Sequence, residues 1–581
     1  MVKTLSHYIG EYKTPSILTP IMMIGEVVME MIIPLLMARI IDVGLANQDL
    51  PYIIRVGLMM LVVALFGLTF GLVAARLAAK ASAGFAKNLR QGMFDRIQTF
   101  SFANIDRFST AGLVTRLTTD ISNVQNAFQM LLRMCFRAPV SLIAALMMAF
   151  IINPHLASIF LITMLILAGI IVLLLVLALR YFKQAFPKYD ALNESVQENV
   201  NGIRVVKAFV RESHEDKKFR KASEGIYRIF IKAEGVVAWN APLMTGTIFV
   251  SLMLLSWIGA KLVVSPGSGL ETGELFSLFT YCLTILMNLM MLSMIFVMIT
   301  MAEPSARRIT EVLTEETTIS NPADPVFTVN DGSIEFSHVT FRYDKHAEEP
   351  VLSDISLSIR SGETIGIIGG TGSSKTSLVN LISRLYDVSE GAVKVGGRDV
   401  RDYDLETLRR EVAVVLQKNV LFSGTIYENL RWGNENATDE ECREAARLAC
   451  ADEFIENFPK KYETVIERGG TNVSGGQKQR LCIARALLKH PKVLILDDST
   501  SAVDTATDAK ITKAFAESIP DTTKLIIAQR ISSVQHADRI LVLDHGHISG
   551  IGTHAELLET NAIYREVYES QTGGSKDFDA L

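Results

Sequence analysis

Six long apolar stretches fill the first half of the chain, and they restrict its fold more than any other feature. Each supplies at least the ~20 residues that a helix needs to cross a bilayer. Lipid offers the backbone no hydrogen-bond partner, so a segment inside it must pair its own N–H and C=O groups, as a helix does. We therefore predict six transmembrane helices. They span Pro15–Ile41, Tyr52–Ala79, Leu131–Ile152, Leu156–Tyr181, Val236–Val264 and Leu275–Met301.

The links between these stretches differ in length and in charge. Those after the first, third and fifth stretches are short and contain neither Lys nor Arg, whereas those after the second and fourth are long and basic. Positively charged links stay on the cytoplasmic side of a membrane. The long links, the N-terminus and the second half of the chain are therefore predicted to be cytoplasmic.

A change in composition separates the membrane half from the rest of the chain. Polar residues and the sequence NPADP fill residues 303–331, which we interpret as a linker between a membrane domain at 1–302 and a second domain at 332–570. Residues 571–581 then form a tail. Within the second domain, β-patterned runs precede mixed strands and helices, a pattern that predicts an α/β domain.

A loop rich in glycine and serine lies between a strand-like run, Thr364–Ile368, and a helix-like run, Leu378–Leu385. In this context backbone N–H groups cradle phosphate oxygens, a lysine adds positive charge and a threonine hydroxyl holds magnesium. The sequence therefore predicts a site for ATP and Mg²⁺. Its residues are Gly369, Gly370, Thr371, Gly372, Ser373, Ser374, Lys375, Thr376 and Ser377.

Further motifs follow in a fixed order. Gln417 follows an apolar run, Ser474–Gln477 read SGGQ, Asp497 ends the run VLILD, and SAVD occupies Ser501–Asp504. Together with the phosphate loop, these motifs make the whole chain resemble the ATP-binding cassette (ABC) family. The resemblance implies a half-transporter of the type IV (B-type) exporter class. Its fold would be a six-helix membrane domain with long cytoplasmic extensions, fused to an α/β nucleotide-binding domain.

The resemblance also implies roles for single residues. Tyr343 matches the aromatic platform for adenine, and Gln417 matches a glutamine that touches magnesium or the attacking water. Thr376 and Asp497 match the residues that hold Mg²⁺. The remaining nucleotide contacts implied by the family are Ser474, Gly475, Gly476, Gln477 and Asp504.

Two regions of the chain are similar to parts through which exporters couple their nucleotide domains to their membrane domains. Thr464–Gly469, which reads TVIERG, resembles an exporter-specific segment of the nucleotide domain. The long basic links look helical, with interruptions near their tips. At such tips the family places short coupling helices that dock on nucleotide domains, and Ser109–Leu117 and Gly202–Phe209 are similar to them.

Three positions depart from the family pattern. Where the family has a glutamate that polarises the attacking water, this chain has Asp498, which is shorter by one methylene. Where the family has a histidine on the terminal phosphate, it has Gln529, which cannot carry charge. Ser374 replaces a loop glycine and restricts the backbone. A displacement of about 1 Å can slow catalysis about a hundredfold, so three departures at one site predict impaired hydrolysis.

The signature, in contrast, is intact at Ser474–Gln477. In the family two nucleotide domains face head to tail, and each signature completes the partner's site. The chain therefore resembles the degenerate-site subunit of bacterial heterodimeric multidrug exporters, located in the plasma membrane. Three alternatives stay open: a homodimer in which Asp498 is a working base, an exporter of lipid or peptide, and a regulatory subunit that binds ATP without moving cargo.

Polar and polarisable side chains in the apolar stretches are candidates for contact with cargo. Glu26 and Glu30 stand four residues apart and share one helix face. Carboxylates in lipid commonly line a cavity, which here would favour cationic amphiphiles. A basic partner on another helix, or a place near the interface, explains them equally well. Flexible thioethers suit varied apolar ligands, although core packing is the simpler explanation for methionines. The methionines concerned are Met287, Met291 and Met294.

The net charge bears on possible partners, and the spacing of the cysteines bears on their chemical state. A net charge of −5 gives no reason to expect a nucleic-acid partner. The five cysteines show no C-x₂-C spacing, so we interpret them as reduced, small apolar residues.

Overall fold

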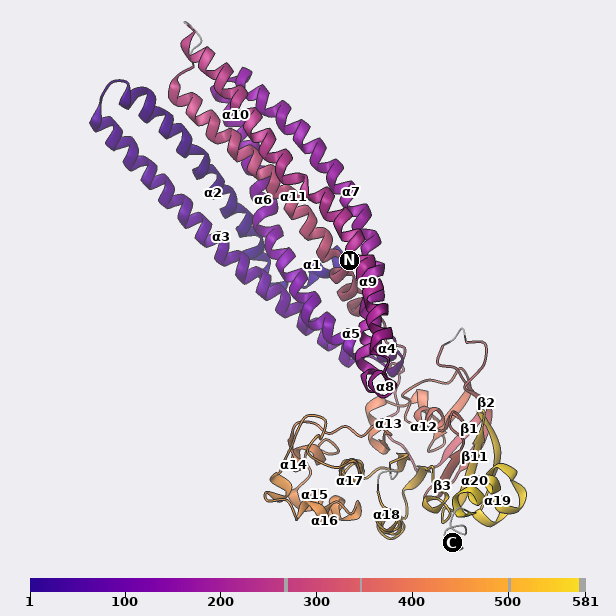
Figure 1. The fold of residues 1–581 in the computed structure, drawn as a ribbon. Helices are drawn as coiled ribbons and strands as arrows, with labels where there is room; N and C mark the ends of the chain where they lie inside the picture. The colour runs from indigo at the N-terminus through magenta and orange to yellow at the C-terminus, as the bar shows by residue number, and fades with distance from the viewer. Residues whose placement is uncertain (266–269, 345–346, 500–502, 574–581) are drawn as a thin grey trace. The chain divides into compact units, whose positions relative to one another are not determined.

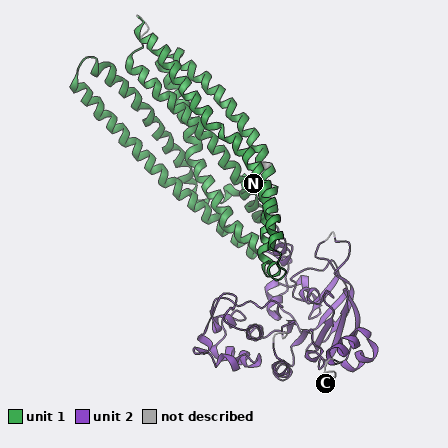
Figure 2. Cartoon of the chain, in the orientation of Figure 1, with its two compact units in different colours: residues 1–98, 110–315 green, residues 99–109, 316–581 purple. Residues whose placement is uncertain are grey.

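The computed structural model describes residues 1–265, 270–344, 347–499 and 503–573. The chain forms two compact units, which are coloured separately in Figure 2. The first unit consists of residues 1–98 and 110–315, and the second of residues 99–109 and 316–581. The short segment 99–109 thus interrupts the first unit in sequence and belongs to the second in space.

The first unit is helical, and among its described residues six helical spans are long and apolar enough to cross a membrane. These six spans contain the six stretches that the sequence predicted. They are Gly10–Leu45, Leu50–Gln98, Thr110–Ile152, Pro154–Tyr181, Glu212–Val264 and Thr272–Thr314. The α-helices of this unit are α1 (Val2–His7), α2 (Lys13–Arg39), α3 (Leu50–Gln98), α5 (Thr110–Thr115), α6 (Ile121–Ile152), α7 (Pro154–Asn201), α8 (Ile203–Ala208), α9 (Glu212–Ala238), α10 (Asn240–Val264) and α11 (Thr272–Thr314).

Helix α2 packs beside α3, and it also contacts α6 and α11 (Figure 1). Two hydrogen bonds join α2 to α11 inside the apolar core. The hydroxyl of Tyr281 donates to the carbonyl of Met31 (2.7 Å), and that of Ser277 donates to the carbonyl of Pro34 (2.7 Å). These buried hydroxyls need a partner in an apolar interior, so the two contacts fix the register of the helix pair.

The second unit contains two larger sheets. The first is antiparallel, in the order β2-β1-β4-β5, and the other has the order β12-β11-β3-β10-β9-β6, parallel except at β12. Strands β9 and β10 are buried along their whole length, as is typical of central parallel strands. The strands are β1 (Ile334–Phe341), β2 (Leu352–Ile359), β3 (Thr364–Gly369), β4 (Glu390–Val395), β5 (Arg398–Asp399), β6 (Val412–Val415), β7 (Gly424–Thr425), β8 (Val465–Ile466), β9 (Val493–Asp497), β10 (Thr523–Ile527), β11 (Arg539–Asp544) and β12 (His547–Gly552).

Helices cover the sheets of the second unit and build an additional helical region, which includes α14 to α17. An apolar core between the antiparallel sheet and the parallel sheet includes Phe336, Ile365 and Leu378. The α-helices of this unit are α4 (Phe102–Phe108), α12 (Lys375–Ile382), α13 (Leu405–Glu411), α14 (Ile426–Leu430), α15 (Asp439–Leu448), α16 (Asp452–Ile455), α17 (Gly475–Leu487), α18 (Thr505–Ser518), α19 (His554–Thr560) and α20 (Ala562–Gly573).

Both short helices expected at the link tips are present. The one expected at Ser109–Leu117 is α5, and the one expected at 202–209 is α8. Both group with the first unit, whereas the helix that groups with the second unit is α4, which the sequence analysis did not identify. A capping box, in which Ser101 and Asn104 cap each other's backbone, starts α4, and Ser109 follows it with a positive φ of 54°.

Candidate functional site

The expected catalytic residues follow four neighbouring parallel strands of the second unit. The phosphate loop follows β3, Gln529 follows β10, Asp497 ends β9 with Asp498 next to it, and Gln417 follows β6. Parallel strands carry their carboxyl ends to one edge, where open α/β sheets bind ligands. The sheet order, which the sequence does not state, is therefore what brings these distant segments to one place.

The phosphate loop closes tightly around its own lysine. The Lys375 ammonium donates to the carbonyls of Gly369 and Gly370 (2.9 Å each) and to the Ser373 hydroxyl (3.1 Å). Burial lowers the pKa of Lys375, although the carboxylates of Asp497 and Asp498 oppose that shift. A Cβ at Gly369 would lie 2.3 Å from the Leu543 carbonyl oxygen, so only glycine fits there.

Ser374 adopts a left-handed backbone conformation. Its φ of 70° and ψ of 24° lie in the left-handed region, which glycine enters freely and a residue with a Cβ enters at a cost of about 1 kcal/mol. At the start of α12 the serine therefore occupies a backbone conformation that favours glycine.

Thr376 and Asp497 converge as a pair of oxygen donors. The Thr376 hydroxyl lies 3.1 Å and 2.9 Å from the two carboxylate oxygens of Asp497. Asp497 is only 2% exposed, and its burial raises the pKa of the carboxyl group. A hydroxyl and a carboxylate at this spacing fit Mg²⁺, which prefers oxygen ligands and keeps several waters.

Two of the three residues that depart from the family pattern are hydrogen-bonded to each other. The Gln529 amide donates to a carboxylate oxygen of Asp498 (2.7 Å). Asp498 is 8% exposed, has a positive φ of 50°, and its N–H donates to the Ile527 carbonyl (3.0 Å). The carboxylate is thus held toward Gln529. Gln417 is exposed, and the β6/β9 register, which pairs Val415 with Leu496, places it level with Asp498.

Tyr343 lies beside the phosphate loop with half of its surface exposed. Its hydroxyl lies 2.9 Å from that of Ser377, on the first turn of α12. Its ring also meets the ring of Tyr386 edge-on, with centroids 5.0 Å apart and an interplanar angle of 89°. A half-exposed aromatic ring close to the loop is suited to serve as an adenine platform.

The signature lies at the start of a different helix. Ser474 is the N-cap of α17, where its hydroxyl accepts from the N–H of Gln477 (3.3 Å) and its own N–H donates to the Gln477 side chain (2.8 Å). Each side chain thus accepts from the other residue's backbone N–H, and within the described part of the chain neither is hydrogen-bonded to the phosphate loop. Asp504 likewise caps α18 through Thr507 (3.0 Å). Ser501 lies outside the described residues.

Glu26 and Glu30, in the apolar part of α2, share one basic partner. This agrees with the explanation that a basic residue on another helix pairs with them. Arg137 on α6 lies 2.7 Å from Glu26 and 3.0 Å from Glu30, both on α2. The Arg137 side chain is 26% exposed, while Glu26 is 21% and Glu30 44% exposed. The sequence analysis allowed for a basic partner on another helix but could not identify Arg137, since the pairing depends on how α2 packs against α6.

The methionines of α11 divide between exposed and partly buried positions. Met287 and Met294 are 64% and 62% exposed, whereas Met291 is intermediate. Exposed thioethers one to two turns apart share a face of the helix. This face is available to a ligand or to a second chain.

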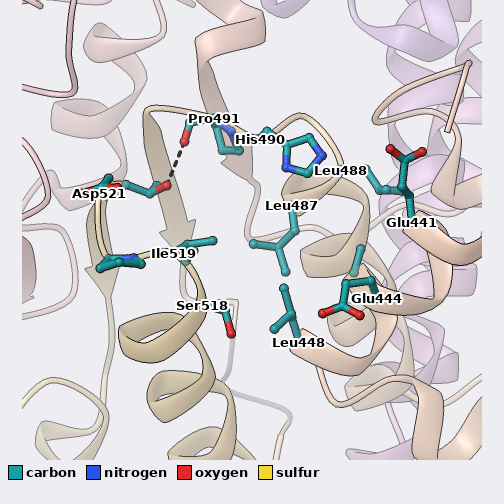
Figure 3. Close-up of a pocket in the computed structure, with 13 residues that line it drawn as sticks. Glu441, Glu444, Leu448, Leu487, Leu488, His490, Pro491, Ser518, Ile519 and Asp521 are labelled. Atoms are coloured by element: carbon teal, nitrogen blue, oxygen red, sulfur yellow. Dashed lines mark hydrogen bonds between the residues drawn. The ribbon is translucent and has the colours of Figure 1, made fainter.

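A separate pocket of about 280 Å³ opens in the second unit, between α15, the end of α17 and the segment after α18 (Figure 3). Leu448, Leu487 and Ile519 give it an apolar wall, and Glu441 and Glu444 lie at its side. Its lining residues come from none of the strand ends that carry the nucleotide motifs. It is therefore separate from the strand ends that carry the nucleotide motifs.

Comparison with known proteins gives matches along the whole chain. Residues 16–290 match the family described as "ABC transporter transmembrane region", and residues 352–501 match the family described as "ABC transporter". The "Uncharacterized ABC transporter ATP-binding protein YfiB" of Bacillus subtilis is 37% identical over 99% of both chains. The similarly described protein Rv1273c of Mycobacterium tuberculosis is 35% identical over 98% of both.

A solved structure has the same fold. It is described as "Structure of a bacterial Atm1-family ABC exporter with ATP bound", and its TM-score is 0.82 at 22% identity. The alignment covers 96% of this chain and 99% of that one. At this identity the likeness establishes the fold.

Proposed function

The chain belongs to the ABC transporter family, and from this premise we propose that it is one half of a heterodimeric exporter whose own ATP site hydrolyses slowly. The transporter uses ATP to move cargo across the membrane that its six helices span. Its long basic links, N-terminus and nucleotide-binding domain lie in the cytoplasm, and the plasma membrane is its location.

The hydrogen bond between Gln529 and Asp498 is the observation that carries the proposal of a slow site. A glutamine cannot become charged, and its amide holds a carboxylate that is already one methylene short of the usual reach. A general base must lie within hydrogen-bond distance of the water it activates. Asp498 is instead directed to a side chain, so the attacking water is poorly activated.

The remaining residues of the site are suited to binding. The exposed face of Tyr343 receives adenine, the loop N–H groups and Lys375 hold the phosphates, and Thr376 and Asp497 hold Mg²⁺. When bound, the ion neutralises phosphate charge. The chain thus retains nucleotide, and the exposed, well-capped signature at Ser474 completes a competent site on its partner.

The membrane unit supplies a candidate surface for amphiphilic cargo. The Glu26, Glu30 and Arg137 cluster carries a formal charge of −1, from two carboxylates and one guanidinium, so it favours a cation. The exposed thioethers of Met287 and Met294 add an adaptable apolar surface. An amphiphilic cation combines both properties.

ATP turnover of the purified full chain in lipid tests the proposal, first alone and then co-expressed with candidate partners. We expect negligible turnover alone, brisk turnover with the correct partner, and loss of that turnover when the partner's catalytic glutamate becomes glutamine. Brisk turnover by the chain alone that disappears in Asp498→Asn would instead make Asp498 a working base in a homodimer.

A further inference from the structure

Tyr386 lies between the expected adenine platform and the short helix α4. Its ring meets Tyr343 edge-on with centroids 5.0 Å apart, and it also contacts Phe341 (5.8 Å). On its other side, its hydroxyl donates to a carboxylate oxygen of Asp106 (2.6 Å), and its ring lies 6.1 Å from that of Phe102. Tyr386 therefore contacts both the nucleotide site and α4.

Polar contacts join helix α4 to the segment that follows α11 in the second unit. The Ser101 hydroxyl lies 2.7 Å from that of Thr318, and the Asn104 amide donates to the Glu316 carbonyl (3.1 Å). Both of these partners lie in the segment that follows α11, whereas Tyr386 follows α12 of the nucleotide-binding core. The Tyr386–Asp106 bond thus ties α4 directly to the core that binds phosphate.

The hydrogen bond has the character of a strong, charge-assisted contact. Burial, followed by the carboxylate of Asp106, raises the pKa of Tyr386, so the phenol keeps its proton and donates it. Bonds in which a carboxylate accepts are shorter and about twice as strong as neutral ones. Such a bond can help to hold a helix of only seven residues in place.

We propose that Tyr386 is a positioning residue through which a nucleotide on Tyr343 fixes the place of α4. The proposal rests on the proposed function, since it requires adenine at Tyr343. A base stacked on the exposed face of Tyr343 restrains that ring, whose edge restrains the Tyr386 ring. The restrained phenol then holds Asp106, and α4 becomes ordered when nucleotide is bound.

Hydrogen–deuterium exchange of the full chain in lipid nanodiscs tests this, with and without Mg²⁺ and the non-hydrolysable analogue AMP-PNP. In the wild type we expect the analogue to slow exchange of the α4 amides by about tenfold, the factor that one charged hydrogen bond supplies. Tyr386→Phe keeps the ring and loses the hydroxyl, so the slowing should disappear while the affinity for AMP-PNP changes less than about twofold.

Two further variants separate the hydroxyl's role from a general effect on the fold. Asp106→Ala should behave as Tyr386→Phe does, whereas Asp106→Asn keeps an acceptor oxygen and should retain part of the effect. Tyr462→Phe is the matched control, because the Tyr462 hydroxyl also donates to an aspartate in the same unit, Asp452 (2.6 Å), without contacting α4. It should leave the α4 response unchanged.

The possible failures are distinguishable. A wild-type chain that binds no AMP-PNP overturns both the proposed ATP site and the proposed link from Tyr343 through Tyr386 to α4, which we call the relay. A chain that binds AMP-PNP while exchange in α4 stays the same, or a Tyr386→Phe variant that keeps the full slowing, overturns the relay alone. A Tyr386→Phe variant that loses affinity by more than about tenfold would place Tyr386 in the adenine site itself and would overturn its role as a positioning residue.

Discussion

At the scale of single residues, the side chain of Asp498 is held in place by a residue far away in sequence. Gln529 lies beyond the neighbouring strand β10, and its amide reaches the carboxylate at 2.7 Å. The sequence revealed both departures from the family pattern separately. It could not reveal that the two side chains bond each other, because that contact depends on β9 and β10 being adjacent.

Lengthening the carboxylate should therefore activate the slow site. Asp498→Glu combined with Gln529→His places a carboxylate one methylene farther out and removes the amide that holds it. We expect ATP turnover by the purified chain to rise roughly tenfold to a hundredfold. Asp498→Asn is the control and should produce no rise. If the double variant hydrolyses ATP no faster than the wild type, another feature limits the site.

Asp497 should make nucleotide binding sensitive to pH. Burial raises the pKa of its carboxyl group, so the group takes up a proton at a higher pH than an ordinary aspartate. Mg²⁺ requires the deprotonated form, and the Mg²⁺-dependent part of AMP-PNP affinity should fall as pH drops through this raised pKa. Titrating the chain with AMP-PNP, with and without EDTA, measures this Mg²⁺-dependent part of the affinity. The Asp497→Asn variant should lack it.

The raised pKa of Asp497 affects the stability of the fold in the opposite direction: lower pH weakens Mg²⁺-dependent binding but favours folding. Between the ordinary and the raised pKa the folded chain binds more protons at Asp497 than the unfolded chain, so without nucleotide this group stabilises folding more as pH falls. Thermal unfolding of Asp497→Asn should lack this contribution. Equal pH profiles for the wild type and the variant would contradict the assigned shift.

At the scale of helices and strands, the bridge between α2 and α6 shows how packing changes the meaning of a residue pattern. The spacing of Glu26 and Glu30 established that they share a face, and the structure adds that this face meets Arg137. Helix α4 gives a second example. Its capping box is local and readable in the sequence, but its grouping with the second unit depends on contacts to residues some 200 to 280 positions away.

Removing the shared cation should destabilise the membrane unit. Arg137→Met leaves two carboxylates without their partner, and we expect a loss of about 1–2 kcal/mol, moderated by the partial exposure of all three side chains. Adding Glu26→Gln to the Arg137→Met variant should recover part of the lost stability. Thermal unfolding in detergent measures both changes.

A surface ion pair provides the comparison for that experiment. Arg220 and Asp216 lie 2.8 Å apart on α9 and are 78% and 55% exposed. Arg220→Met should therefore change stability by less than about 0.5 kcal/mol. A similar loss at both arginines would mean that the α2–α6 bridge is no stronger than a surface pair.

At the scale of the whole molecule, six spans and two basic links define a topology that labelling can test. In a chain whose native cysteines are replaced, a cysteine at Asn47, in the short first link, should react with a membrane-impermeant maleimide from outside intact cells. A cysteine at Val210, which is 80% exposed in the second long link, should react only after permeabilisation. The reverse pattern would overturn the predicted orientation.

The sequence alone determined the parts of this protein that depend on local composition and spacing. Six apolar stretches predict six membrane helices because lipid forces each backbone to satisfy itself, and the phosphate loop lies between a strand and a helix because its glycines permit the turn. Only the tertiary structure decided which segments meet. The parallel sheet brings Thr376 to Asp497 and Gln529 to Asp498, the helix packing gives Glu26 and Glu30 their shared arginine, and α4 reaches Tyr386. Contacts between residues so far apart are fixed by packing and strand order, which no local pattern encodes.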